Sequence, residues 1–213
     1  MQEHTVTAGG QTYKLEEPFF VLATQNPIEQ DGTYPLPEAQ TDRFMFKLEV
    51  GFPSIQELTA IVNMTQQTMA EMAQPVLTGE DLLAMRATAR EIPVMEDVLL
   101  TAMRLVSASH PELETASDFA KKYIRFGASP RAAQALITAG KVRALMNGRY
   151  NVSYDDIKAL AYPVLRHRIK PSFAAITEKI STDRIISELL DEVSGKKKVQ
   201  VPFLSGGADK RKH

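Results

Sequence analysis

Cysteine is absent from this chain of 213 residues. Its absence excludes disulfide bridges, thiolate catalysis and zinc sites built on cysteine. The four histidines are not paired at a spacing of four residues, so the sequence favours no metal site made of side chains alone. No apolar run approaches the roughly 18 residues of a membrane span, and residues 1–15 lack the apolar core of a signal peptide. We therefore expect a cytoplasmic protein without a membrane span.

An excess of charge of either sign is also absent, because the formal net charge is −1. Composition therefore gives no reason to expect nucleic acid or an anionic membrane as a partner. Residues 196–213 are nevertheless basic, and Phe203 is their only aromatic residue, so they offer no platform for stacking bases. We interpret this segment as a flexible, solvated basic tail, with a docking element as the alternative.

The third absence concerns phosphate binding. The chain contains no G-x-x-x-x-G-K-[ST] sequence, the loop that cradles nucleotide phosphates. Residues 185–192 superficially resemble an apolar strand that ends in Asp-Glu, a magnesium-binding pattern of many ATPases. Their apolar residues repeat at a spacing of four, however, and charged residues fill the other positions. This pattern predicts an amphipathic helix.

The first 53 residues have the pattern of a sheet fragment. A glycine pair at residues 9–10 predicts a tight β-hairpin turn. Residues 19–24 are apolar on both faces, as in a central strand that helices cover. Residues 37–42 have room for one or two helical turns, and residues 44–50 alternate like a strand. So short a fragment cannot cover both faces of its central strand, so we expect further strands upstream and a truncation at Met1.

From residue 54 onward the pattern is helical. Capping pairs predict where helices begin, and they are Ser54 with Glu57, Thr78 with Asp81, and Ser153 with Asp156. Ser129 and Pro130 predict a further helix that ends near residues 147–148, and apolar spacing predicts others at 93–109 and 173–192. The expected fold class is mainly α, with an α/β fragment at residues 1–53, a helical domain at 54–195 and the tail at 196–213.

Two polar residues flank the short predicted helix. Asn26 follows the predicted central strand, at the edge of a sheet where α/β proteins bind ligands, and could orient a water molecule against a phosphate. The alternative is a turn-forming Asn before a proline. Arg43 could act in trans on a neighbouring subunit's nucleotide, where such arginines raise hydrolysis about 10³–10⁵-fold. The alternative is a surface ion pair with Asp42.

Arg131 is in an unusual position for a cation. It is the second residue of the helix that Ser129 caps, where it faces the positive end of the helix dipole at a cost of up to about 1 kcal/mol. A helix N-terminus with an arginine suits an anion. The alternative is an arginine that reaches solvent or a nearby carboxylate. The dipole alone predicts that Arg131→Glu slightly stabilises the helix.

Together these segments resemble the MoxR family of AAA+ ATPases, from about Pro18 to Pro202. The matching segments are residues 23–29 (Ala-Thr-Gln-Asn-Pro-Ile-Glu), 32–40 (Gly-Thr-Tyr-Pro-Leu-Pro-Glu-Ala-Gln), 42–44 (Asp-Arg-Phe), 127–132 (Gly-Ala-Ser-Pro-Arg-Ala) and 161–168 (Ala-Tyr-Pro-Val-Leu-Arg-His-Arg). The resemblance implies that Asn26 is sensor 1, Arg43 the arginine finger and Arg131 sensor 2. It implies an AAA+ α/β core followed by a helical lid that packs on the nucleotide.

The resemblance also implies ATP and Mg²⁺ as cofactors and a homo-oligomeric ring, usually a hexamer. Family members act as chaperone-like machines that mature or assemble other proteins, often with a von Willebrand factor A-domain partner. The family's Walker A and B segments lie upstream of sensor 1 and are missing here. We therefore expect ATP hydrolysis by the intact protein and none by this chain alone. The alternative is a non-enzymatic helical adaptor that kept only the lid.

Overall fold

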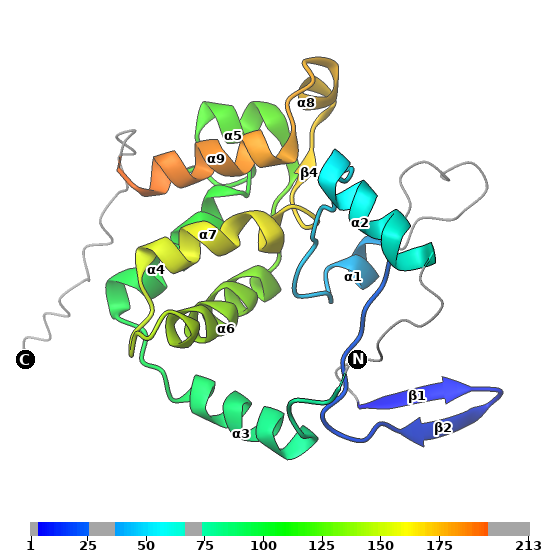
Figure 1. The fold of residues 1–213 in the computed structure, drawn as a ribbon. Helices are drawn as coiled ribbons and strands as arrows, with labels where there is room; N and C mark the ends of the chain where they lie inside the picture. The colour runs from blue at the N-terminus through cyan, green and yellow to red at the C-terminus, as the bar shows by residue number, and fades with distance from the viewer. Residues whose placement is uncertain (1–3, 26–36, 67–73, 196–213) are drawn as a thin grey trace, which may run out of the picture.

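A computed structural model describes residues 4–25, 37–66 and 74–195. Figure 1 shows a bundle of helices formed by the second half of the chain, beside which lie the first hairpin and the segment around α1 and α2. The elements in order are β1 (Thr5–Ala8), β2 (Gln11–Lys14), α1 (Glu38–Thr41), α2 (Ile55–Gln66), α3 (Gly79–Arg90), α4 (Glu96–Ala108), α5 (Asp118–Tyr123), β3 (Ile124–Phe126), α6 (Pro130–Met146), α7 (Tyr154–Leu165), β4 (Lys170–Pro171), α8 (Phe173–Thr177) and α9 (Thr182–Val193).

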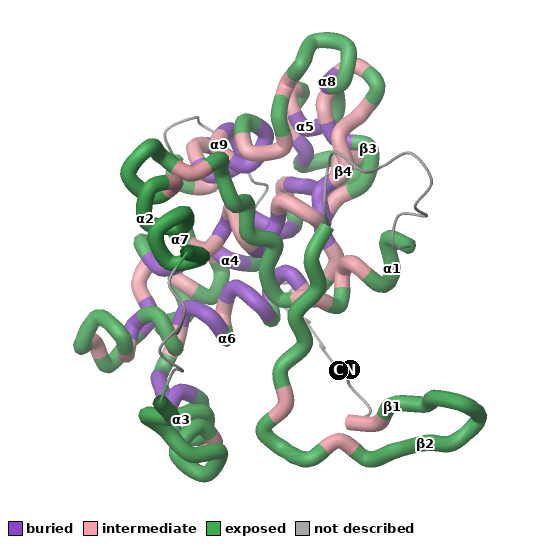
Figure 2. The backbone as a smooth tube through the Cα atoms, turned by 45° about the vertical axis from the view of Figure 1, so that its right-hand side comes forward, coloured by how far each residue is buried: buried purple, intermediate pink, exposed green. Residues whose placement is uncertain are grey.

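The core lies among α4, α6, α7 and α9. Helix α6 packs against α7 and α4, and α9 packs against α4 and α7. Burial follows the same division: the buried backbone in Figure 2 belongs largely to these helices, whereas the hairpin and α2 are exposed. The largest fully buried side chains are aliphatic, among them Leu105, Leu136, Ile157, Leu165, Ile185, Ile186 and Leu189. The helical part of the chain therefore has a hydrophobic core of its own.

The predicted helix starts are confirmed. Reciprocal capping hydrogen bonds form between Thr78 and Asp81 at α3 and between Ser153 and Asp156 at α7. At α2 the backbone N–H of Ser54 donates to Glu57 Oε2 over 2.7 Å, and the N–H of Glu57 donates to Ser54 Oγ over 3.3 Å. Such contacts depend only on residues close in sequence, so the sequence alone predicts them.

Helix α6 also begins and ends as expected. Ser129 caps it, Pro130 is its first residue, and Gly148, with φ +66°, follows its end. Its third turn passes close to the loop before α7, because a Cβ on Gly140 would lie 3.0 Å from Val152 Cγ1. A larger residue at position 140 would push the two segments apart.

Two helical predictions need correction. The helix predicted at 93–109 begins only at Glu96. The single helix predicted at 173–192 is two helices, α8 and α9, because Lys179 takes a left-handed conformation with φ +55° and Ser181 starts a new cap. The sequence also gave no indication of α5 or of the β3–β4 pair.

The β-hairpin is confirmed, with Gly9 and Gly10 at φ +59° and +79° between β1 and β2. Neither strand predicted at 19–24 and 44–50 is present. Phe20 is 85% exposed and Val50 is 96% exposed. A strand needs backbone partners on a neighbouring strand, and no strand in the described part of the chain pairs with these segments.

Asn26 and the basic tail at 196–213 lie outside the described residues. Among the helices that the structure does describe, none combines the length and the apolar character that crossing a membrane requires.

Candidate functional site

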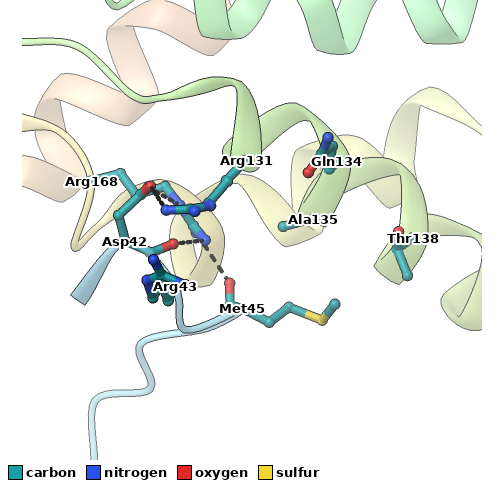
Figure 3. A pocket seen from close by; sticks show the side chains of 8 residues that line it. All are labelled: Asp42, Arg43, Met45, Arg131, Gln134, Ala135, Thr138 and Arg168. Atoms are coloured by element: carbon teal, nitrogen blue, oxygen red, sulfur yellow. Dashed lines mark hydrogen bonds and ion pairs between the residues drawn. The ribbon is translucent and has the colours of Figure 1, made fainter. Parts of the chain in front are cut away.

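Asp42 joins three parts of the chain that are far apart in sequence. It directly follows α1 and lies between the N-terminus of α6 and the turn after α7. Ser129 Oγ lies 2.7 Å from Asp42 Oδ1 and 2.9 Å from Oδ2. Arg131 Nη1 donates to Oδ2 over 3.1 Å, and Arg168 Nε donates to Oδ1 over 3.1 Å. Figure 3 shows the carboxylate between the two guanidinium groups.

Arg168 is held more completely than any ordinary surface arginine. Its side chain is 2% exposed, and its five N–H donors make five hydrogen bonds. Besides Asp42 Oδ1, the acceptors are the backbone carbonyls of Asp42, Phe44, Met45 and Val164. A buried cation is tolerated only when it is paired and fully hydrogen-bonded, and Arg168 meets both conditions.

The neighbours of Arg168 bind the same segment. His167 Nε2 lies 3.0 Å from the carbonyl oxygen of Phe44, and Arg166 Nη1 donates to that of Lys47 over 3.3 Å. The N–H of Lys47 donates to the carbonyl of Pro163 over 2.8 Å. The segment of residues 42–47 is therefore bound to the C-terminal end of α7 and the turn after it through four of its residues. These contacts take the place of the strand pairing that the alternation of residues 44–50 predicted.

Electrostatics around Asp42 favour its charged form. Burial works to raise its pKa, but the hydrogen bonds from Ser129 and Arg131 and the charge of Arg168 outweigh burial and hold the pKa below its usual value. Burial, and then the charge of Arg168, lowers the pKa of His167 to about 4. His167 is therefore neutral at pH 7, and its buried Nδ1 has no hydrogen-bond partner among the residues that the structure describes.

A cavity of about 240 Å³ opens beside this network. Its lining residues are Asp42, Arg43, Met45, Arg131, Gln134, Ala135, Thr138 and Arg168 (Figure 3). Three guanidinium groups and one carboxylate give the lining a net positive charge, which suits an anion. Typical pockets for small molecules measure about 300–1,000 Å³, so this cavity has the size for a phosphate group rather than a whole nucleotide.

The structure brings together two of the three predicted site residues. Arg43 and Arg131 line the same cavity, and Asn26 lies outside the described residues. For Arg131 the nearby-carboxylate alternative is realised, since Asp42 accepts its hydrogen bond. For Asp42 the described contacts are with Ser129, Arg131 and Arg168.

Sequence reasoning missed Asp42 as the centre of the network and missed Arg168 altogether. A signal for Arg168 was present. The buried residues Ile157, Ala161 and Val164 form one stripe of α7, and residue 168 continues it at helical spacing. An arginine on an apolar stripe marks a buried cation that must have partners.

Comparisons with known proteins show what the chain is similar to. Residues 1–46 match the model of the ATPase family associated with various cellular activities (AAA), and residues 117–189 match the AAA lid domain. A protein of Mycobacterium tuberculosis named Chaperone MoxR1 is 39% identical over 194 residues, 91% of this chain and 51% of that protein. The chain belongs to the MoxR family of AAA+ ATPases.

Other MoxR-family relatives give the same result. Protein MoxR of Paracoccus denitrificans is 30% identical over 182 residues, 79% of this chain and 53% of that protein. The crystal structure of a candidate ATPase from Cytophaga hutchinsonii matches with a TM-score of 0.80 at 39% identity, and covers 89% of this chain and 58% of that one. The predicted fold class, part of an AAA+ domain joined to a helical lid, is confirmed. The chain spans about half the length of the curated relatives it matches.

The donor set at the site fits one cofactor of this family better than the other. Guanidinium groups bind phosphate oxygens, often in pairs, so Arg43 and Arg131 fit the phosphates of ATP. Magnesium prefers carboxylate and water oxygens. In the part of the chain that the structure describes, no group of three or more His, Asp or Glu side chains is placed to hold a metal ion.

Proposed function

We propose that this chain is part of a ring-forming, chaperone-like ATPase in which Arg43 and Arg131 face the phosphates of one ATP molecule. One observation carries the proposal: both arginines line one positively charged cavity, in which the Asp42 carboxylate binds Arg131. Because Asp42 is charged, its oxygens hold Arg131 at the rim of the cavity before any ligand arrives. Arg131 is therefore oriented in advance, which lowers the entropic cost of binding.

Each residue has a separate part in the reaction. ATP with Mg²⁺ supplies the phosphoryl group that water attacks. Arg131 binds phosphate oxygens in the ground state, and Arg43 stabilises the negative charge that grows in the transition state. Asn26 orients the attacking water. Residues 1–53 contribute to the nucleotide-binding domain, residues 54–195 form the lid, and residues 196–213 form a basic tail.

The resemblance to the family supports the wider biological assignment. We propose a homo-oligomeric ring, with a hexamer as the expected size, in the cytoplasm. The ring matures or assembles other proteins, and a von Willebrand factor A-domain protein is a candidate partner. The relative named Chaperone MoxR1 supports the chaperone-like role. The intact protein, meaning the longer ATPase that contains this chain, supplies the Walker segments, so the 213 residues alone turn over no ATP.

The test is Arg43→Ala in the intact protein. We expect nearly unchanged ATP binding and a fall in hydrolysis of about 10³-fold or more, since the arginine acts on transition-state charge. The matched control is Arg104→Ala, which removes an exposed arginine of α4 that is not part of the cavity lining. Binding is measured by equilibrium titration and hydrolysis by phosphate release. Equal hydrolysis by both variants would contradict the proposed role of Arg43. Absence of hydrolysis by the wild-type intact protein would favour the non-enzymatic adaptor.

A further inference from the structure

We propose that Arg168 is a positioning residue, which fixes the place of Arg43 and so makes hydrolysis depend on the position of the helical domain. The inference rests on the proposed role of Arg43. Arg168 lines the cavity, but its five N–H donors are all bonded to protein acceptors, so none is left for a phosphate and Arg168 itself acts on no reacting atom. Its effect is transmitted through the backbone on either side of Arg43.

Arg168 binds backbone carbonyl groups on both sides of Arg43 in the sequence. Arg168 Nη2 donates to the carbonyl oxygens of Asp42, over 3.0 Å, and of Phe44, over 2.6 Å. Arg168 Nη1 donates to that of Met45 over 3.2 Å. One rigid, planar guanidinium group therefore holds the residue before Arg43 and the two residues after it. The backbone of Arg43 cannot move or rotate without breaking one of these three hydrogen bonds.

Arg43 lies outside the helices and strands of the described chain. It lies in a turn between α1, which is a single exposed helical turn, and residues 44–54, which form no helix or strand. On the α1 side, its N–H donates to the carbonyl of Gln40 over 3.2 Å. The described ion pair between α1 and the rest of the chain, Lys170 with Glu38, is long at 3.7 Å and exposed. The buried Arg168 is the deeper anchor.

Arg168 is in turn fixed to α7. Its own N–H donates to the carbonyl of Leu165 over 2.9 Å, and its Nη1 also donates to that of Val164. The next residue, Ile169, is 1% exposed and belongs to the hydrophobic core. The C-terminal end of α7 and the backbone around Arg43 therefore move as one unit. A shift of the helical domain relative to a neighbouring subunit would displace Arg43 by the same amount.

Lysine separates the charge of Arg168 from its geometry. A lysine keeps the positive charge beside Asp42, but it presents donors from a single atom and cannot reach carbonyls on both sides of Arg43. Arg168→Lys should therefore loosen the position of Arg43 while the charge balance of the network remains. Misplacement of a catalytic group by about 1 Å can cost about 10²-fold in rate.

The experiment measures single-turnover hydrolysis and ATP affinity in the intact protein. We expect Arg168→Lys to slow hydrolysis about 10–100-fold with ATP affinity unchanged. In an Arg43→Ala background the same substitution should cause no further loss, because an effect transmitted through Arg43 vanishes with it. If Arg168 had only a structural role, its substitution would slow hydrolysis equally in both backgrounds. Non-additive losses of hydrolysis therefore distinguish positioning from a structural role.

The matched control is Arg149→Lys. Arg149 makes a bidentate pair with the buried Asp156, over 2.7 and 2.5 Å, at the opposite end of α6 and α7. The same chemical change there should lower the melting temperature and leave the hydrolysis rate intact.

The outcomes separate the inference from the proposed function. Full activity of Arg168→Lys would overturn the positioning role of Arg168 but not the proposed catalytic role of Arg43. The same holds if Arg168→Lys causes an equal loss of hydrolysis in the wild-type and the Arg43→Ala backgrounds. Full activity of Arg43→Ala would instead overturn the proposed function itself. If Arg168→Lys does not fold, Asp42→Asn takes its place, measured at saturating ATP so that its weaker hold on Arg131 does not lower the rate; the variant weakens the same network from the other side. It should give the same non-additivity with Arg43→Ala, and additive losses would overturn the inference.

Discussion

Asp42 and Asp156 are both bound by arginines, but the two carboxylates differ in what surrounds them. Asp156 is 1% exposed and combines its Arg149 pair with a 2.9 Å hydrogen bond from the N–H of Ser153. Burial alone would raise its pKa, but the hydrogen bonds of Arg149 and Ser153 outweigh burial and lower the pKa to about 2. Asp156 joins residues close in sequence and caps α7. Asp42 instead joins distant segments beside an open cavity, where its arginines can also meet a ligand.

His167 makes the stability of the chain depend on pH. Its pKa is lowered from 6.5 to about 4 in the folded chain, first by burial and then by Arg168. Between these values the unfolded chain binds the proton that the folded chain does not, so stability is lost as pH falls from 6.5 towards 4. At 1.36 kcal/mol per pKa unit the upper limit is about 3 kcal/mol, and partial contact with solvent reduces it.

His167→Gln tests this dependence. An amide N–H can still donate to the carbonyl of Phe44, but it does not titrate. We expect urea unfolding of the wild-type chain to show a steeper loss of stability between pH 6.5 and 4 than the variant. The carboxylates titrate in both proteins, so the difference between the two curves isolates His167. Parallel curves would mean that protonation of His167 does not oppose folding.

At the scale of elements, the N-terminus of α6 shows two electrostatic effects with opposite signs. The helix dipole disfavours Arg131, whereas Asp42 Oδ2 at 3.1 Å favours it. The dipole argument alone predicts a slight stabilisation by Arg131→Glu. With Asp42 present, the new carboxylate would instead lie beside an existing one, and repulsion replaces an attraction.

We therefore expect Arg131→Glu to lower the melting temperature of the chain, by an amount equivalent to about 1 kcal/mol for a partly exposed pair. In an Asp42→Asn background the repulsion is gone and only the dipole remains, so the same substitution should be neutral or slightly stabilising. Thermal melting of the four proteins forms a double-mutant cycle. An equal effect in both backgrounds would show that Asp42 does not interact with residue 131.

Elements that depend on nearby residues could be predicted from the sequence, and elements that depend on distant partners could not. The capping pair of Thr78 and Asp81 is separated by three residues, and it formed as expected. Residues 44–50 have the alternation of a strand, but their described long-range backbone partners lie far away in the sequence, in α7 and the turn after it, rather than in a strand. The hydrogen bonds of Arg168 also join segments that are distant in sequence. The sequence shows that an arginine is present at position 168, but not which carbonyl groups it binds.

At the scale of the whole molecule, burial is uneven. The helical part of the chain encloses a core, whereas large apolar side chains before α3 are exposed, among them Phe20 at 85%, Leu22 at 78%, Val50 at 96% and Phe52 at 88%. We expect a region with so much exposed apolar surface to pack against other protein. The Arg43 and Arg131 cavity is lined by residues of both regions. A contact between subunits there would reach both arginines at once.

Since Arg43 and Arg131 line one cavity, we expect both to act across the same subunit interface. The test mixes intact subunits that carry Arg43→Ala with subunits that carry Arg131→Ala and measures ATP hydrolysis. If both arginines act on the neighbour's nucleotide, every interface lacks one of them, and mixing restores no activity. If Arg131 acts on its own subunit's nucleotide, the interfaces where an Arg131→Ala subunit donates Arg43 to an Arg43→Ala subunit are complete, and activity returns. As a control, each variant mixed with a subunit that binds but cannot hydrolyse ATP should regain part of its activity, which also shows that subunits exchange. Recovery in the first mixture would contradict a shared interface and assign the two arginines to different nucleotides.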